Sequence, residues 1–260
     1  MWPVILALAA LFGTGIWALV PAFTPKGNGG LVVVGSYATS LADRTESQVR
    51  NARLAARTIN GVRIAPGEVF SFNAHVQGWA QDEGYVKAPV SYGGELVRDY
   101  GGGVCQTSTT LYNAALLAGL PVLERHAHTF HPAYVPPGRD AAVAYPGVDL
   151  RFANNLAWPL TIRARANGEV LQVELVGASP NPLEVRISEH VLDVTTPARL
   201  TRNLPPSDGR IRHKYLRSPG LSGCRALVWR SFWSNGREVR RESLSDDTYT
   251  AMDRIVALLQ

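Results

Sequence analysis

The feature that most restricts the fold is a long succession of strand patterns that begins at residue 141. The segments AAVAY, VDLRF, PLTIRAR and EVLQVELVG follow one another up to residue 177, and each has the β-branched content or alternation of a strand. Asn167-Gly168 lies between the last two and is typical of a hairpin turn. Consecutive strands joined by short turns pair antiparallel, so the pattern argues against a doubly wound sheet and favours an α+β fold.

Upstream of this run, a strand and then a helix are predicted. The sequence LVVVGSY at residues 31–37 is β-branched and bounded by glycines, as strands are. Residues 43–60 carry a helical apolar stripe made of Val49, Ala52, Ala56 and Ile59. Thr45 and Gln48 have the spacing of a capping box, and Asn60-Gly61 is a stop signal.

A second helix is predicted between further strands. Residues 69–72 alternate like a strand, and the Gly- and Tyr-rich stretch 78–103 indicates two short strands. A helix is then expected from Cys105 to Ala118, where Gly119 ends it and Pro121 follows. PVLERHAH at 121–128 has the pattern of another strand.

The C-terminal part is predicted to be rich in β-structure. LEVRIS begins it, and VWRSFWSNGREVRRESL predicts a hairpin that turns at Asn235-Gly236. A short helix is expected over residues 247–259. The Ser-Pro-Asn-Pro sequence at 179–182 is a candidate boundary. The predicted organisation is an N-terminal segment (1–30), a core domain (31–180) and a smaller C-terminal region (181–260).

The N-terminal segment has the character of a membrane anchor. No side chain from Met1 to Pro25 is charged, and residues 4–23 are apolar apart from Thr14. About 20 apolar residues in a helix cross a bilayer core. Because the n-region carries no basic side chain and no convincing A-x-A cleavage site stands before Lys26, an uncleaved single-pass anchor is favoured over a cleaved signal. The main domain is expected outside the cytoplasm, although Lys26 taken alone favours the opposite orientation.

Charge and cysteine content exclude several classes of protein. The net charge is +5, almost all of the basic residues are arginines, and they are dispersed without a nucleic-acid-binding motif. An anionic cell wall or membrane surface is therefore the expected partner, with genome base composition as an equal explanation for the arginines. Two cysteines are too few for a disulfide-dense scaffold or a Cys-rich zinc module. No cofactor is predicted.

The sharpest chemical feature is Cys105, which follows three glycines at the start of the predicted helix. The unpaired N–H groups of a helix N-terminus favour a thiolate. His128 or His126 on the next strand is a candidate base, with His131 just beyond, and Asp140 or Asp149 is a candidate to orient it. The order of cysteine on a helix, histidine on a strand and then an acid matches the layout of papain and transglutaminases.

Three other readings of these residues stay open. Cys105 is equally a small buried residue, or the partner of Cys224 in a disulfide outside the cytoplasm. His126 and His128 share one strand face, and with Cys105 they form a weak candidate for a metal site. The candidates for binding a substrate, each with an ordinary structural alternative, are Tyr100, Gly102, Gly103, Gln106, Ser108, Thr109 and Arg125.

From GGGVCQTSTTLYNAALLAGLPVLERHAHTFHPAYVPPGRD to VDLRFANN, the sequence resembles the VanW family. The upstream segments PGEVFSFN and EGYVKAPV fit the same family, and the resemblance covers about residues 45–190. It implies a bacterial cell-envelope protein, membrane-anchored or secreted, and carries over no established catalytic residue.

Two functions follow as hypotheses. The first is a Cys/His hydrolase or transferase that acts on peptidoglycan peptide, on its precursor or on a related amide. In it Cys105 is the nucleophile, His128 or His126 the base and Asp140 the orienting group. The second is a non-catalytic module that binds cell-wall glycopeptide and in which Cys105 is structural.

Overall fold

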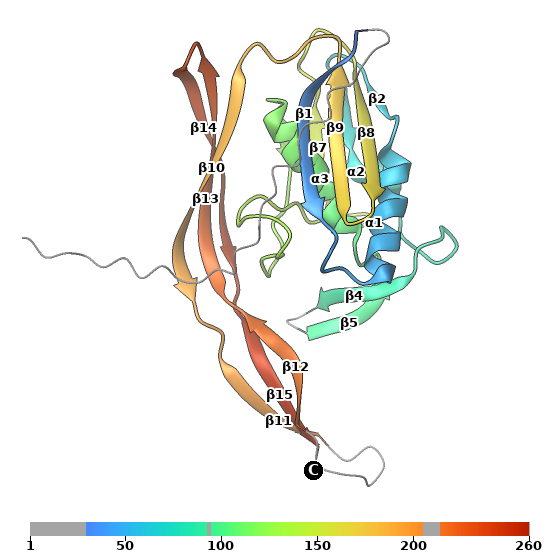
Figure 1. Ribbon diagram of the computed structural model, residues 1–260, viewed down its shortest axis with the longest axis vertical. Coiled ribbons are helices and arrows are strands. Elements are labelled where there is room, and N and C mark those ends of the chain that lie inside the picture. The colour runs from blue at the N-terminus through green and yellow to red at the C-terminus, as the bar shows by residue number, and fades with distance from the viewer. Residues whose placement is uncertain (1–29, 93–94, 205–213, 260) are drawn as a thin grey trace, which may run out of the picture.

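The structure, a computed structural model, describes residues 30–92, 95–204 and 214–259. Figure 1 shows two parts that lie side by side: a layered part of helices and sheets, and a long ribbon of strands that runs past it and beyond one end. Most of the sheet pairing is antiparallel and only three helices are present in the described residues, so the α+β prediction holds with a larger share of strand.

A four-stranded sheet forms the front layer of the core in Figure 1. Its order is β1-β9-β8-β2, and every neighbouring pair is antiparallel. The strands are β1 (Val32–Ser40), β2 (Arg63–Ile64), β8 (Leu160–Asn167) and β9 (Val170–Gly177). Asn167 pairs with Val170, so the predicted hairpin turn lies between them.

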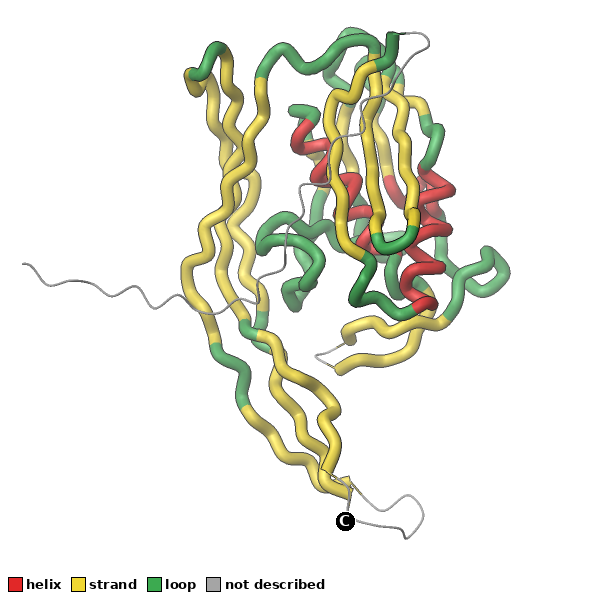
Figure 2. The backbone as a smooth tube through the Cα atoms, viewed as in Figure 1, coloured by secondary structure: helices red, strands yellow, loops and turns green. Residues whose placement is uncertain are grey.

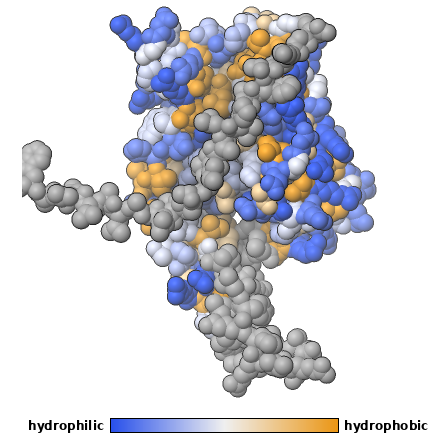
Figure 3. All heavy atoms as spheres, viewed as in Figure 1, coloured by the Kyte–Doolittle hydropathy of each residue, from blue (hydrophilic) through white to orange (hydrophobic). Residues whose placement is uncertain are grey.

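Two helices cover one face of this sheet and contact each other, as the tube view in Figure 2 also shows. They are α1 (Glu46–Ile59) and α3 (Val104–Leu117). The capping box predicted for α1 is present, since Gln48 N donates to Thr45 Oγ1 and Thr45 N donates to Gln48 Oε1. Ala52, Ala56 and Ile59 of the predicted stripe are buried. Hydrophilic residues cover the opposite side of α1 (Figure 3), as expected for an amphipathic helix.

Shorter elements connect the core. A three-stranded sheet of order β3-β7-β6 contains β3 (Val69–Ser71), β6 (Val122–Glu124) and β7 (Arg151–Ala153). The five-residue helix α2 (Phe72–Val76) was not predicted, and Ser71 caps it. β4 (Lys87–Tyr92) and β5 (Glu95–Tyr100) form the hairpin expected within residues 78–103.

Two of the predicted core strands are much reduced. The strand expected over 121–128 is limited to β6, after which only the bridge between His126 and Ala142 is formed. AAVAY at 141–145 contributes only isolated bridges. The backbone of Ala141 instead bonds the side chains of Ser108 and Thr109 on α3, so those groups replace a strand partner.

The C-terminal part is the long ribbon of Figure 1. One half is a sheet of order β10-β13-β14, and the other has the order β11-β15-β12. The hairpin predicted at Asn235-Gly236 joins β13 to β14, and both turn residues have positive φ. The strands are β10 (Glu184–Thr195), β11 (Arg199–Leu204), β12 (Lys214–Leu221), β13 (Gly223–Ser234), β14 (Arg237–Tyr249) and β15 (Met252–Leu259).

The helix predicted over residues 247–259 is wrong, because β14 extends to Tyr249 and β15 follows almost at once. β15 pairs in parallel with β11 and antiparallel with β12. A short apolar run such as IVALL does not distinguish a strand from a buried helix. Residues 252–259 form a strand because pairing with β11 and β12, which are distant in sequence, satisfies their backbone hydrogen-bonding groups.

The predicted membrane helix at 4–23 lies outside the described residues. No helix within 30–92, 95–204 and 214–259 is both long enough and apolar enough to span a bilayer. The boundary predicted at 179–182 falls between β9 and β10, and the division into domains stays a prediction.

The ribbon is fastened to the core at the C-terminal end of α3. Arg230 on β13 is buried and donates Nη1 to the carbonyls of Leu116 (3.2 Å) and Leu120 (2.8 Å). The Arg230 Nε atom donates to Glu242 Oε1 on β14 over 2.6 Å. A guanidinium on the last carbonyls of a helix complements their partial negative charge. This attachment brings β14 alongside the loop that precedes Ala141.

Candidate functional site

Cys105 is the second residue of α3, and its thiol is half-buried. In its protonated form the thiol donates to the carbonyl of Val143 over 3.4 Å. Gly103 is the N-cap of the helix and has φ of 108°, which places it in the left-handed region. The turn at 101–103 therefore aims the first turn of α3, and with it the thiol, at the loop 126–143.

The two glycines singled out in the sequence are explained by packing. A Cβ atom at Gly102 would lie 2.7 Å from the carbonyl oxygen of Pro89, and one at Gly103 would lie 2.2 Å from the carbonyl oxygen of Gln48. Asn51 on α1 also donates to the Gly102 carbonyl over 2.9 Å. The glycines thus allow α1 and β4 to approach the start of α3.

We expect Gly103→Ala to lower the free energy of unfolding by about 2 kcal/mol or more. The new Cβ would meet backbone rather than a flexible side chain, and φ of 108° is strained for alanine. Urea denaturation followed by circular dichroism measures the effect. Gly147→Ala, where a Cβ meets nothing within 4 Å, is the matched control. Equal stability of the two variants would contradict the packing role.

His128 and Asp140 lie together opposite the start of α3. The His128 Nδ1 atom is 2.6 Å from Asp140 Oδ2, and the same oxygen accepts from the His128 backbone N–H over 2.7 Å. Asp140 is fully buried, whereas the His128 side chain is 24% exposed. Because Nδ1 is engaged by Asp140, Nε2 is the ring nitrogen left for Cys105.

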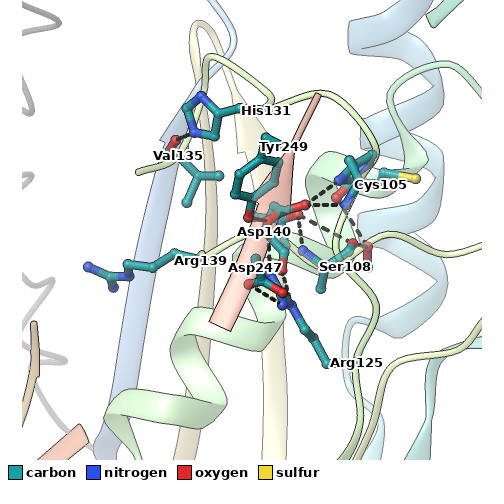
Figure 4. A network of polar contacts seen from close by, with 12 residues as sticks. Cys105, Ser108, Arg125, His131, Val135, Arg139, Asp140, Asp247 and Tyr249 are labelled. Atoms are coloured by element: carbon teal, nitrogen blue, oxygen red, sulfur yellow. Dashed lines mark hydrogen bonds and ion pairs between the residues drawn. The ribbon is translucent and has the colours of Figure 1, made fainter. Parts of the chain in front are cut away.

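The second carboxylate oxygen of Asp140 is held by groups from two other elements (Figure 4). Arg125, just after β6, donates Nη2 to Asp140 Oδ1 over 2.8 Å and Nε to the Asp140 carbonyl over 2.6 Å. Tyr249 at the end of β14 donates its hydroxyl to the same Oδ1 over 2.5 Å. Arg125 Nη1 reaches Asp247, also on β14, over 2.6 Å. The buried carboxylate is thus paired and hydrogen-bonded on both oxygens.

These contacts set the charges of the site. Burial disfavours the ionised Asp140, but the hydrogen bond and charge of His128, then Arg125 and Tyr249, outweigh it and hold its pKa well below the usual range. Burial likewise disfavours imidazolium, yet Asp140 and Cys105 raise the pKa of His128 to about 10. Burial would raise the pKa of the Cys105 thiol, but the hydrogen bond and charge of His128 lower it. The two shifts act in the same direction: each favours a thiolate beside an imidazolium over the neutral pair.

Other predicted site residues on α3 serve to hold the loop or the sheet. Gln106 is buried and donates to Thr39 Oγ1 and to the Ser40 carbonyl, so its amide N–H groups face β1 rather than the thiol. Ser108 donates to the Ala141 carbonyl over 2.6 Å. Thr109 Oγ1 accepts from Ala141 N over 3.0 Å. Ser108 and Thr109 therefore fix the residue after Asp140 against the helix.

The remaining candidate residues are bonded to groups other than Cys105 and His128. Arg125 is only 8% exposed and is saturated by Asp140 and Asp247, so its guanidinium is bound internally. The His126 side chain is exposed and contacts Glu124, away from Asp140. Tyr100 donates to Gln81 over 2.8 Å. Asp149 is bonded to Ser71 and to the backbone of Asn73, which leaves Asp140 as the acid beside the histidine.

The disulfide and the metal site considered for Cys105 are absent from the residues that the structure describes. Cys105 and Cys224 are both free thiols. Within the described residues, no three His, Cys, Asp or Glu side chains are grouped as a metal site requires, so Cys105, His126 and His128 do not form one.

Four contributors to the site were missed in the sequence. Asp247 and Tyr249 lie in a segment that was predicted to be helical. They are 107 or more residues from Asp140 in the sequence, and no local sequence pattern connects positions so far apart. Tyr134 is hydrogen-bonded to Thr109, and its pKa is raised by burial and by the neighbouring Cys105. The guanidinium of Arg44 lies 5.0 Å from the centre of the Tyr134 ring and has no carboxylate partner within the described residues. Of these four residues, only Tyr134 lies in a segment next to the predicted site, in HPAYVPP just after His128.

Comparison with known proteins gives the family of the core. A family model described as VanW like protein matches residues 47–176. An uncharacterized protein, YoaR of Bacillus subtilis, is 41% identical over 142 residues, which are 55% of this chain and 47% of YoaR. The vancomycin B-type resistance protein VanW of Enterococcus faecalis is 34% identical over 115 residues, which are 42% of each chain. The chain thus spans less than half the length of these relatives.

One solved structure, the crystal structure of HP0197-G5, is also similar to part of the chain. It is 17% identical and aligns with a TM-score of 0.15, over 28% of this chain and 96% of the other. A similarity of this size supports no conclusion about fold or function. The matched family segment, 47–176, contains Cys105, Arg125, His128 and Asp140 and ends before β10 begins.

Proposed function

The chain belongs to the VanW-like protein family, and from this premise we propose that it is a cysteine-dependent acyl-transfer enzyme of the bacterial cell envelope. The proposed substrate is an amide in the peptide part of peptidoglycan, in its precursor, or in a related molecule. Cys105 is the nucleophile, His128 the acid and base, and Asp140 the group that orients His128. The residues 4–23 are proposed to anchor the chain in the membrane, with the main domain outside the cytoplasm.

One observation carries the proposal. Cys105, His128 and Asp140 come from a helix, an extended segment and a loop, and their side chains form one connected line at the start of α3. A cysteine activated by a histidine that is oriented by a third group is the arrangement that nucleophilic acyl transfer uses. A purely structural cysteine has no need of a buried carboxylate behind its histidine.

The proposed reaction has two steps, acylation of Cys105 and transfer of the acyl group to water or an amine. The Cys105 thiolate attacks the amide carbonyl carbon, a C–S bond forms, and the oxygen becomes an oxyanion. When the C–N bond breaks, the His128 imidazolium gives its Nε2 proton to the departing amine, which leaves a thioester. Water or an acceptor amine then attacks as His128 takes its proton, the C–S bond breaks and the thiolate returns. The proposed donor to the oxyanion is the backbone N–H of Cys105 in the first turn of α3, because the N–H groups of Val104 and Gln106 already bond the carbonyls of Gly101 and Gly103.

The substrate class rests on two further points. One relative of the chain is named a vancomycin B-type resistance protein, which places that protein, though not this one, in a cell-wall context. Arg44, next to Tyr134 and without an acidic partner in the described residues, suits a substrate that carries a carboxylate near the reacting bond. Stem peptides of peptidoglycan carry such groups.

The alternative is a non-catalytic module that binds cell-wall glycopeptide. It requires Cys105 to be structural, and the free state of both thiols removes the disulfide that would have supported it. It would be favoured by a Cys105 thiol that resists alkylation until the protein unfolds.

The decisive test is the pH dependence of Cys105 alkylation by iodoacetamide, in the full chain carrying Cys224→Ser. We expect the rate to rise with a midpoint below the ~8.5 of a free thiol, because the lowered pKa of Cys105 leaves it ionised at lower pH. His128→Gln should move the midpoint upward, since the imidazolium that stabilises the thiolate is lost.

His126→Gln is the matched control, because His126 lies two residues away and contacts Glu124 instead. It should leave the alkylation profile unchanged. A midpoint of ~8.5 or above in the parent, or equal shifts in the two histidine variants, would overturn the proposal.

A further inference from the structure

Asp140 is held from a part of the chain that the family match does not reach. Tyr249 and Asp247 both lie on β14, in the C-terminal ribbon, beyond the matched residues 47–176. Figure 4 shows Tyr249, Asp140, Asp247 and Arg125 converging on one point beside α3. The relevant distances are 2.5 Å from the Tyr249 hydroxyl to Asp140 Oδ1 and 2.6 Å from Arg125 Nη1 to Asp247 Oδ2.

The charges from His128 to Asp247 alternate: positive at His128, negative at Asp140, positive at Arg125 and negative at Asp247. The thiolate of the proposed function adds a negative charge at Cys105, beside His128. Each inner group has a partner of opposite sign on both sides. A buried charge without such compensation is costly, so each member depends on the next. This series of charged groups therefore runs from Cys105 at the start of α3 to Asp247 on β14 in the ribbon.

Tyr249 adds a neutral hydrogen bond at the same carboxylate. Its ring is buried, and its hydroxyl also accepts from the backbone N–H of Gly138 over 2.8 Å. One hydroxyl thus fixes the loop before Asp140 and takes up part of the negative charge on Oδ1. Both Tyr249 bonds would be lost if β14 moved away from the loop.

We propose that β14 completes the reactive site, with Tyr249 and Asp247 as positioning residues that act on His128 through Asp140 and Arg125. This inference rests on the proposed function. It means that the segment common to the family is insufficient for the site in this chain, and that the ribbon has a role in the chemistry as well as in the fold.

The sign of each effect follows from charge. Removing the Tyr249 hydroxyl leaves more negative charge on Asp140, which stabilises the imidazolium and raises the pKa of His128. Removing the charge of Asp247 takes a negative group away and leaves Arg125 to bind Asp140 alone, which lowers the pKa of His128. The other titratable groups that face this line are Tyr112 on α3, Arg44 before α1, and His131, Tyr134 and Arg139 in the loop.

The experiment follows the imidazole of His128 by carbon-13 NMR against pH, in the full chain in detergent micelles with labelled histidine. His128→Gln assigns the signal. The expected results are a midpoint moved upward in Tyr249→Phe and downward in Asp247→Asn, each by about half a pH unit. Tyr85→Phe, a buried core tyrosine outside the line, should leave it unchanged. Thermal unfolding of each variant is measured alongside.

The outcomes separate this inference from the proposed function. A parent midpoint near the ordinary ~6.5 of histidine rejects the thiolate–imidazolium pair, and with it the proposed function. A high parent midpoint that neither β14 variant moves, or that moves in the opposite directions, rejects the role of β14 alone. A lower melting temperature with an unchanged midpoint likewise makes Tyr249 and Asp247 merely structural.

Discussion

Cys105→Ser is expected to reduce acyl-transfer activity by about 10³-fold or more while leaving the fold intact. Serine is close to cysteine in size, so the substitution changes only the thiol contact to Val143 and the interaction of Cys105 with His128. A hydroxyl, however, is not ionised by a neighbouring imidazolium, so the nucleophile is lost. The measurement is release of products from purified muropeptides by liquid chromatography and mass spectrometry, with circular dichroism to confirm folding.

Cys224→Ser is the control for this substitution. Cys224 is a buried residue of β13 that packs with Ala226 and Tyr249, and Ala127 packs against the same cluster. Serine keeps nearly the same shape there, and the Cys224 thiol is not part of the proposed line of Cys105, His128 and Asp140. Its variant should keep most of the activity of the parent. Product formation by Cys105→Ser at the parent's rate would eliminate Cys105 as the nucleophile.

Asp140→Asn is expected to have the largest combined effect. Activity should fall by about 10⁴-fold, because an amide in place of the carboxylate no longer selects the His128 tautomer or stabilises imidazolium. The free energy of unfolding should fall by about 3–5 kcal/mol near neutral pH, since Arg125 loses one partner of a buried pair. Asp149→Asn removes a carboxylate of the same core that does not contact His128, and it should retain the activity.

The stability effect of Asp140→Asn has a defined pH window. The folded pKa of Asp140 is depressed, so its contribution is present above the unfolded value of ~3.9 and is lost as pH falls through the folded pKa. The folded pKa of His128 is raised to about 10, so its contribution is complete below ~6.5 and is lost as pH rises toward 10. Urea denaturation at pH 3, 6 and 10 should show the largest difference from the parent at pH 6. A difference independent of pH would contradict the charge pairing.

Much of the core could be predicted because its signals are local. The capping box at Thr45 and Gln48, the stop at Gly119 and the two Asn-Gly hairpins each lie within a few residues, and the structure contains all of them. The cysteine, histidine and acid of the site were also named, since a reactive thiol at a helix start is a short-range pattern. Which histidine and which acid belonged to it stayed open.

That choice depends on contacts between distant segments. His128 is selected over His126 because Asp140 Oδ2 accepts both from its ring and from its backbone, whereas His126 faces Glu124. Arg125 was a candidate for binding a substrate, and it is buried because Asp140 and Asp247 take its donors. Residues 247–259 were expected to be helical, but they contain the end of β14 and all of β15, whose strand partners lie far away in the sequence.

The sequence by itself determined the antiparallel core, its two main helices and the placement of a thiol at the start of one of them. Each of these follows from periodicity and capping within single segments, where backbone preferences act. Only the tertiary structure decided that Asp140 is paired on both oxygens and that β14 supplies Tyr249 and Asp247. A buried charge is stable only when groups of opposite charge or hydrogen-bond donors lie beside it. In this fold those groups come from segments far apart in the sequence, so no local spacing of residues predicts them.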